Sequence, residues 1–214
     1  MNQKVNLYGF RFGITAFVAN GLFVIVQTLQ LLKILRYPLD EIFIYGLSLC
    51  IVIPFVLEML ALHHVTSADK KYWSHAALIF TIIYAVFVTA NYVVQLATVI
   101  PLTLKGTLEK TSVLIQTPHS MFWDFDAIGY ISMGFAMLLA LPVFEKKGFQ
   151  RWVRISFLAN ALVTPLIAFV YFYPEFSERL LLLAIPWTIT APVAMLLLAI
   201  MFKKMTQKKN NPNN

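Results

Sequence analysis

The sequence predicts an all-α, polytopic membrane protein, a bundle of six transmembrane helices with its N- and C-termini in the cytoplasm. Apolar runs of 18 or more residues recur along the whole chain, and each is long enough to cross a bilayer. The 214 residues are 59% hydrophobic and only 13% charged, about half the charged fraction of a soluble domain. So few charges could not cover the surface of a soluble core, which excludes a soluble globular fold.

The six spans make up one membrane domain, 12–202, between two polar ends. The first run is too long for a cleaved signal peptide and lacks a small-residue cleavage pattern, so we interpret it as an uncleaved span. Each run has the roughly 20 residues needed to cross the hydrocarbon core. The predicted spans are 12–32, 41–62, 73–100, 121–144, 152–173 and 180–202.

The segments outside the spans are short. Residues 1–11 are predicted to be a cytoplasmic N-terminus, and the basic tail 203–214 is predicted to be disordered in the cytoplasm. Pro101 is expected to end the third span, because proline cannot donate a backbone hydrogen bond. The connection 101–120 is then the longest external loop.

The positions of the basic residues predict the orientation. With the N-terminus inside, 12 of the 17 lysines and arginines fall in cytoplasmic segments and 5 in external loops. Short cytoplasmic loops are enriched in basic residues, so both termini are predicted to be inside. The net charge of +7 therefore indicates topology and contact with phospholipid head groups rather than nucleic-acid binding.

Two acids begin the fourth predicted span, in the stretch MFWDFDAIGY. An acid inside the membrane is costly and is a functional-site hypothesis by default. Asp124 has a structural explanation, because it can interact with the positive end of the helix dipole, with Ser120 as the N-cap. Asp126 lies deeper, about 8 Å below the start of the helix, and is the stronger candidate.

Other intramembrane polar residues are expected at the height of Asp126, in the outer half of the bundle. Asn91 and Gln95 are four residues apart and therefore share one helix face. We predict a pocket open to the outside, of the kind that binds small ligands, lined by Gln27, Asn91, Gln95, Asp126, Tyr130 and Trp187. The alternative is that these side chains only form hydrogen bonds between helices.

A second polar cluster is predicted near the cytoplasmic side, formed by Glu58, His63 and His75. Glu58 is expected to pair with His75 or Lys71 across the short inner loop. The alternative is a proton relay through the bundle, with an acid at each end. Glu58 and Asp126 lie on opposite sides of the membrane and cannot form a catalytic carboxylate pair.

No metal or cofactor site is expected. His63 and His64 are adjacent, so on a helix they point about 100° apart, and no HxxxH or HExxH spacing occurs. No serine lies in a nucleophile-elbow motif. The single cysteine, Cys50, cannot form a disulfide within the chain.

The segments NYVVQL (91–96) and TPHSMFWDFDAIGY (117–130) contain a Pro-His pair, an acid and a Gly-Tyr pair. Through these the chain resembles uncharacterised six-helix bacterial integral membrane proteins, over about residues 50–150. The resemblance implies a bacterial plasma-membrane location and no particular chemistry.

Three functions are compatible with the sequence. The first is a multi-pass plasma-membrane protein that binds, or binds and transports, a small or lipid-like ligand in the pocket centred on Asp126. The second is a membrane-embedded enzyme in which Asp126 acts as acid or base on a lipid-like substrate; it is weakened by the lack of a second catalytic group at that depth. The third is a structural or assembly subunit without a ligand. The expected partners are the lipid bilayer and that ligand; the oligomeric state is left open.

Overall fold

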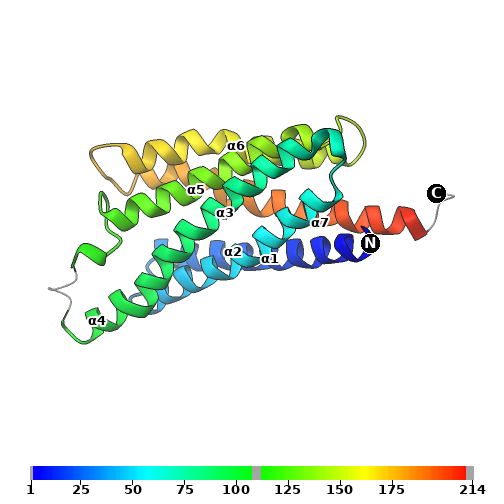
Figure 1. The fold of residues 1–214 in the computed structure, drawn as a ribbon. Helices are drawn as coiled ribbons and strands as arrows, with labels where there is room; N and C mark the ends of the chain where they lie inside the picture. Colours follow the sequence, from blue (N-terminus) through cyan, green and yellow to red (C-terminus); the bar gives the residue numbers. More distant parts are fainter. Residues whose placement is uncertain (1, 108–111, 211–214) are drawn as a thin grey trace.

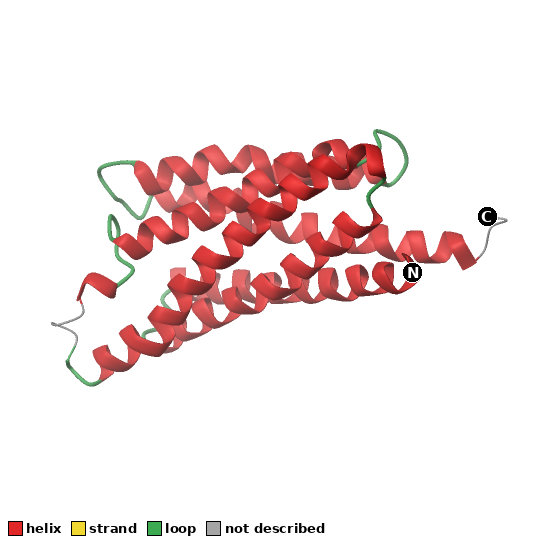
Figure 2. Cartoon of the chain, in the orientation of Figure 1, coloured by secondary structure: helices red, strands yellow, loops and turns green. Residues whose placement is uncertain are grey.

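The computed structural model describes residues 2–107 and 112–210, and within these ranges the chain contains helices and no strand (Figure 2). Six helical segments are long and apolar enough to span a membrane, which confirms the predicted all-α fold. Their main helices are α1 (Asn2–Leu31), α2 (Leu39–Val65), α3 (Lys71–Val94), α5 (Met121–Ala140), α6 (Gln150–Phe172) and α7 (Ile185–Asn210).

The six spans pack as a closed ring in chain order. Each packs against the next along the chain, and α7 packs back against α1. Both termini therefore lie at the same end of the elongated bundle, while α4 (Ile100–Leu104) lies at the opposite end (Figure 1). We call the end with the termini the inner end, because its basic residues predict a cytoplasmic location, and the opposite end the outer end.

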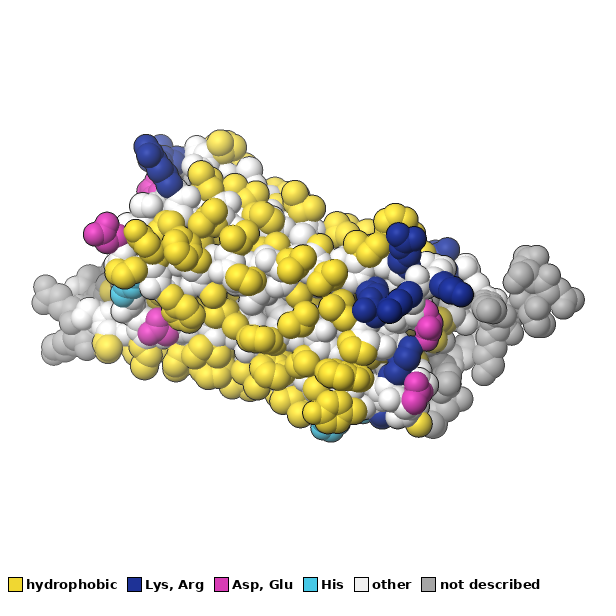
Figure 3. Space-filling view, turned by 90° about the horizontal axis from the view of Figure 1, so that it is seen from above, with side chains coloured by type: hydrophobic (Ala, Val, Ile, Leu, Met, Phe, Trp, Pro, Cys, Tyr) yellow, Lys and Arg dark blue, Asp and Glu magenta, His cyan; other side chains and the backbone are white. Residues whose placement is uncertain are grey.

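The surface of the bundle is apolar along its middle and charged at its ends. Large hydrophobic side chains are exposed on all six spans, whereas asparagine, glutamine, serine and acid side chains are buried between the helices. Figure 3 shows this apolar band, with lysine and arginine side chains gathered mainly at the inner end. A soluble protein would show the reverse distribution, so this is a multi-pass membrane protein.

The third span continues past Pro101, so its predicted end is wrong. A π-helical turn, η2 (Gln95–Val99), joins α3 to α4 without a break, and the N–H of Ile100 bonds to the carbonyl of Gln95. Pro101 comes directly after this π-helical turn, where the hydrogen-bond pattern changes from π to α, and a residue without a backbone donor is tolerated at that change. Pi-helical turns within helices are frequently found at functional sites.

Both ends of the chain are more helical than predicted. Helix α1 starts ten residues before the predicted span, and α7 continues to Asn210, so the prediction of disorder is wrong for 203–210. Lysine, methionine and glutamine favour helix, and the last turns are also held by packing, since Lys203 and Lys204 lie over the rings of Phe10 and Phe149. Residues 211–214 of the predicted tail lie outside the described residues.

Apart from the outer loop between α4 and α5, short connections join the spans. The 3-10 segments of the described chain include η1 (Ala68–Lys70), η4 (Leu141–Val143) and η5 (Leu180–Ala184).

Candidate functional site

Asp126 lies at the centre of a buried polar cluster in the outer half of the bundle. Its side chain is only 4% exposed. The hydroxyl of Tyr171 donates a hydrogen bond to Oδ2 over 2.5 Å, and Nδ2 of Asn91 donates one to Oδ1 over 3.3 Å. The carboxyl group of α5 is thus held by one group from α6 and one from α3.

A segment of the outer loop folds over this cluster. Gln95 holds the segment twice, because its Nε2 donates to the carbonyl of Leu114 (2.8 Å) and its Oε1 accepts from the N–H of Gln116 (3.2 Å). Nδ2 of Asn91 also donates to Oε1 of Gln116, over 3.0 Å. We call residues 112–117 the covering segment. The predicted pocket open to the outside is therefore closed in this structure.

Aromatic rings from the spans surround the acid. Tyr92 bonds to Tyr130 through the two hydroxyl groups at 3.1 Å and stacks on Tyr45 with ring centroids 5.2 Å apart. Tyr130 meets the edge of Trp187 at 5.0 Å, and Trp187 in turn meets Phe23 at 6.0 Å. With Tyr171, every one of the six spans contributes an aromatic side chain to this region.

The cluster is electrostatically incomplete. Within residues 2–107 and 112–210, neither lysine, arginine nor histidine pairs with Asp126, and the described ion pair lies elsewhere. Two buried polar atoms, Oδ1 of Asn91 and Nε1 of Trp187, have no hydrogen-bond partner. An acid without a cation lies next to an unused acceptor on Asn91, and an unused donor lies on Trp187, which contacts Tyr130. Such unpaired polar groups form a chemical environment suited to a ligand.

The structure brings together five of the six residues that were predicted to line the outer site. Asn91, Gln95 and Asp126 share hydrogen bonds directly or through Gln116, and Tyr130 and Trp187 form the adjoining aromatic contact. Gln27 is half-buried on α1, and its side chain forms no hydrogen bond with the described residues, so the sixth predicted member stays a prediction.

Four contributors to the site were missed from the sequence. Tyr171 stood at the right depth but among many outer aromatic residues, and Tyr45 and Tyr92 looked like ordinary packing residues. Gln116 lies in a loop whose fold has no periodicity. The only feature of the sequence that could have indicated a role for Gln116 is its position, five residues before the helix that contains Asp126.

Asp124 has the structural role predicted for it, with Ser120 as the N-cap. The side chain of Ser120 accepts a hydrogen bond from the N–H of Trp123, which begins α5. Asp124 lies in the first turn, exposed, where a negative charge stabilises the helix dipole. It is not part of the buried cluster.

Glu58 does not form the pair expected with His75 or Lys71. It is fully buried, both its carboxyl oxygens lack a hydrogen-bond partner, and it lies against Gly13 of α1. Lys71 instead donates to the backbone carbonyls of His63 and Thr66. The helix rotation that turns Glu58 into the bundle could not be read from an apolar sequence.

The histidines at the inner end form a small structural cluster. His63 bonds through Nδ1 to the hydroxyl of Ser74 at 2.9 Å, and its ring meets that of His75 at 5.6 Å. In the described part of the chain, no three histidine, cysteine or acid side chains lie close enough to hold a metal ion.

Comparisons with known proteins do not assign the chain to a family. No protein-family model matches it, and neither a curated protein nor a solved structure shows significant similarity to it. The resemblance to six-helix bacterial membrane proteins therefore stays a prediction, and function has to be argued from the site alone.

Proposed function

We propose that this chain is a multi-pass protein of the bacterial plasma membrane that binds a small or lipid-like ligand at Asp126. The observation that carries the proposal is the acid itself, buried among neutral donors and aromatic rings with no cation from the described residues beside it. Acids inside membrane proteins are retained mainly where they pair with something or take part in function. A ligand would supply the missing partner.

The chemistry of the surroundings favours a ligand with a positively charged nitrogen. Aromatic faces attract cations, and tyrosine and tryptophan cages recognise quaternary ammonium groups. Here Tyr92, Tyr130 and Trp187 form a connected group of aromatic rings in the same region as the acid, and their faces would meet the cation in the ligand-bound protein. An ammonium-bearing molecule or lipid would pair with Asp126 and lie against these rings.

Entry of such a ligand requires the covering segment to move. It is held to the helices by the hydrogen bonds of Gln95 and Asn91. These few bonds can be exchanged for bonds to water or to a ligand at modest cost. Opening of residues 112–117 toward the outer side is the step that would turn binding into uptake or release.

A thermal-unfolding screen of the detergent-purified protein tests this proposal. Choline is the probe, and 3,3-dimethylbutan-1-ol, its neutral isostere, is the control for apolar binding. We expect choline to raise the unfolding temperature, since a ligand at 100 times its Kd stabilises by about 2.7 kcal/mol. The stabilisation should vanish in Asp126→Asn and persist in Asp124→Asn.

The same screen can contradict the proposal. Equal stabilisation by choline and by the alcohol would rule out recognition of charge. An Asp126→Asn protein that is merely less stable, with no response to choline in the wild type, would assign the cluster to interhelical bonding.

A further inference from the structure

A polar hollow lies at the inner end of the bundle, far along the helices from the buried cluster at Asp126. It has a volume of about 530 Å³ and adjoins a smaller one of about 200 Å³ that shares Lys70, Phe144 and Glu145 with it. Volumes of this size are typical of small-ligand sites. The hollow is formed where η1 meets the turn that leads from η4 into α6.

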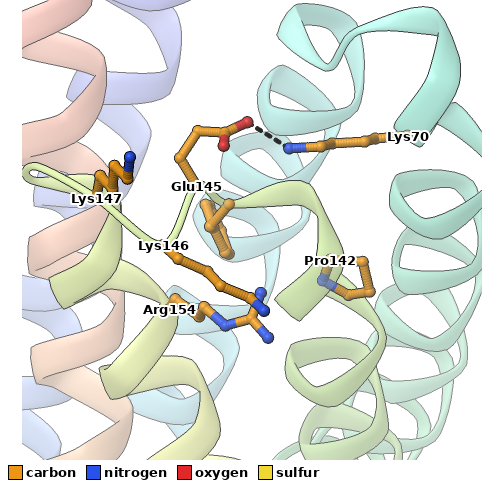
Figure 4. A pocket seen from close by; sticks show the side chains of 7 residues that line it. Lys70, Pro142, Glu145, Lys146, Lys147 and Arg154 are labelled. Carbon is orange, nitrogen blue, oxygen red and sulfur yellow. Dashed lines mark hydrogen bonds and ion pairs between the residues drawn. The ribbon is translucent and has the colours of Figure 1, made fainter.

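The lining of this hollow is strongly basic. Four cationic side chains, from Lys70, Lys146, Lys147 and Arg154, face one acid, Glu145 (Figure 4). The positive-inside tendency explains why basic residues are found at this end. It does not explain why four of them converge on one hollow, where like charges repel.

Two of the cations are held in place by the fold. Nζ of Lys70 donates to Glu145 at 2.5 Å and to the carbonyl of Val143 at 3.3 Å, and Arg154 donates through Nη1 to the carbonyl of Leu141 at 2.9 Å. A guanidinium group has five N–H donors, so Arg154 keeps donors for another partner. Its position is fixed before any ligand arrives.

The other two cations have no partner in the described chain. Lys146 and Lys147 are exposed and form neither a hydrogen bond nor an ion pair with the described residues. In Figure 4 the side chain of Lys146 extends toward that of Arg154. Because only Lys70 is neutralised, by Glu145, the hollow carries an excess of three positive charges.

We propose that this hollow binds a phosphate group. Arginine and lysine together are the usual ligands for phosphate oxygens, and basic pockets between spans on the cytoplasmic side bind lipid head groups. The phosphate comes either from an anionic phospholipid or from a soluble phosphate compound. This site is independent of the one at Asp126, so either can fail without the other.

The test uses the purified full chain with two probes. Phosphatidylglycerol is compared with phosphatidylcholine by native mass spectrometry, and inorganic phosphate is titrated in a thermal-unfolding assay at constant ionic strength, with chloride as reference. Lys146→Gln/Lys147→Gln removes two unbonded cations and should leave folding intact. Lys4→Gln/Arg11→Gln removes the same charge at exposed inner-end positions outside the hollow.

We expect the Lys146→Gln/Lys147→Gln protein to bind whichever probe the wild type binds, phosphatidylglycerol or inorganic phosphate, about tenfold more weakly. The control protein, Lys4→Gln/Arg11→Gln, should bind that probe within about twofold of the wild type. Preference for phosphatidylglycerol without an effect of inorganic phosphate identifies a lipid head group, and stabilisation by inorganic phosphate identifies a soluble ligand. Equal losses in both double variants, or no preference for either probe over its reference, would overturn the proposal.

Discussion

The hydroxyl of Tyr171 donates a 2.5 Å hydrogen bond to Oδ2 of Asp126, which ties the outer end of α6 to the first turns of α5. The two residues are 45 positions apart in the chain, and both spans also pack against each other. Through this bond and that of Asn91, the costly acid becomes the point where three helices are fixed together. Both partners are neutral groups, so within the described residues Asp126 has no counter-charge.

Removal of the Tyr171 hydroxyl should weaken this junction. We expect Tyr171→Phe to destabilise the protein by about 1 kcal/mol, because the buried Oδ2 atom of Asp126 loses its hydrogen-bond donor. Tyr173→Phe is the matched control, since that side chain is exposed and unbonded in the described chain. Thermal unfolding in detergent measures both, and equal midpoints for the two variants would contradict the assigned bond.

Gly13 should be intolerant of a side chain because Glu58 occupies the space beside it. An added Cβ would collide with Oε1 of Glu58 and with the Cβ of Ala199. We expect Gly13→Ala to cost about 1–3 kcal/mol, whereas Gly21→Ala, where nothing lies within 4 Å of the added atom, should be neutral or slightly stabilising.

A second variant shows whether Glu58 causes that cost. In a Glu58→Ala background, Gly13→Ala should cost clearly less than in the wild type, since the colliding carboxyl group is gone. Unfolding midpoints of the four proteins give the coupling. Strictly additive effects would mean that Glu58 does not pack on Gly13.

The covering segment should open when its anchor is removed. Gln95→Leu loses the bonds to Leu114 and Gln116, so amide hydrogen exchange in residues 112–117 should become faster. Gln27→Leu, the control, alters a glutamine whose side chain forms no hydrogen bond within the described chain. Unchanged exchange in Gln95→Leu would show that these bonds do not hold the segment.

The orientation can be tested by labelling with a membrane-impermeant maleimide. In a Cys50→Ser background, a cysteine at Lys204 should be labelled only from the cytoplasmic side and a cysteine at Lys105 only from outside. Both positions are exposed, at opposite ends of the bundle. Labelling of residue 204 from outside would invert the topology and place the site at Asp126 on the cytoplasmic face.

The fold and the height of the site could be predicted because both depend on counting along a helix. Run length sets the number of spans, and the fixed rise per residue placed Asp126 near the height of Asn91 and Gln95. The hydrogen bond between Asn91 and Asp126 agrees with this for Asn91, and Gln95 is linked to the same cluster through Gln116. Rotation about the helix axis could not be predicted, because lipid-facing and buried faces of these spans are both apolar. That is why the surroundings of Glu58 were missed. The position of the covering segment could not be predicted either, because it depends on hydrogen bonds from an irregular loop to Asn91 and Gln95, and such a loop has no periodic sequence pattern.

Native mass spectrometry of the detergent-purified wild type beside Asp126→Asn tests the central claim most directly. We predict a discrete small-molecule or lipid adduct that is retained by the wild type and by Asp124→Asn and is lost or weakened in Asp126→Asn. The mass of that adduct would identify the ligand class. An adduct held equally by wild type and Asp126→Asn, or none on either while Asp126→Asn is only less stable, would contradict a ligand site at Asp126.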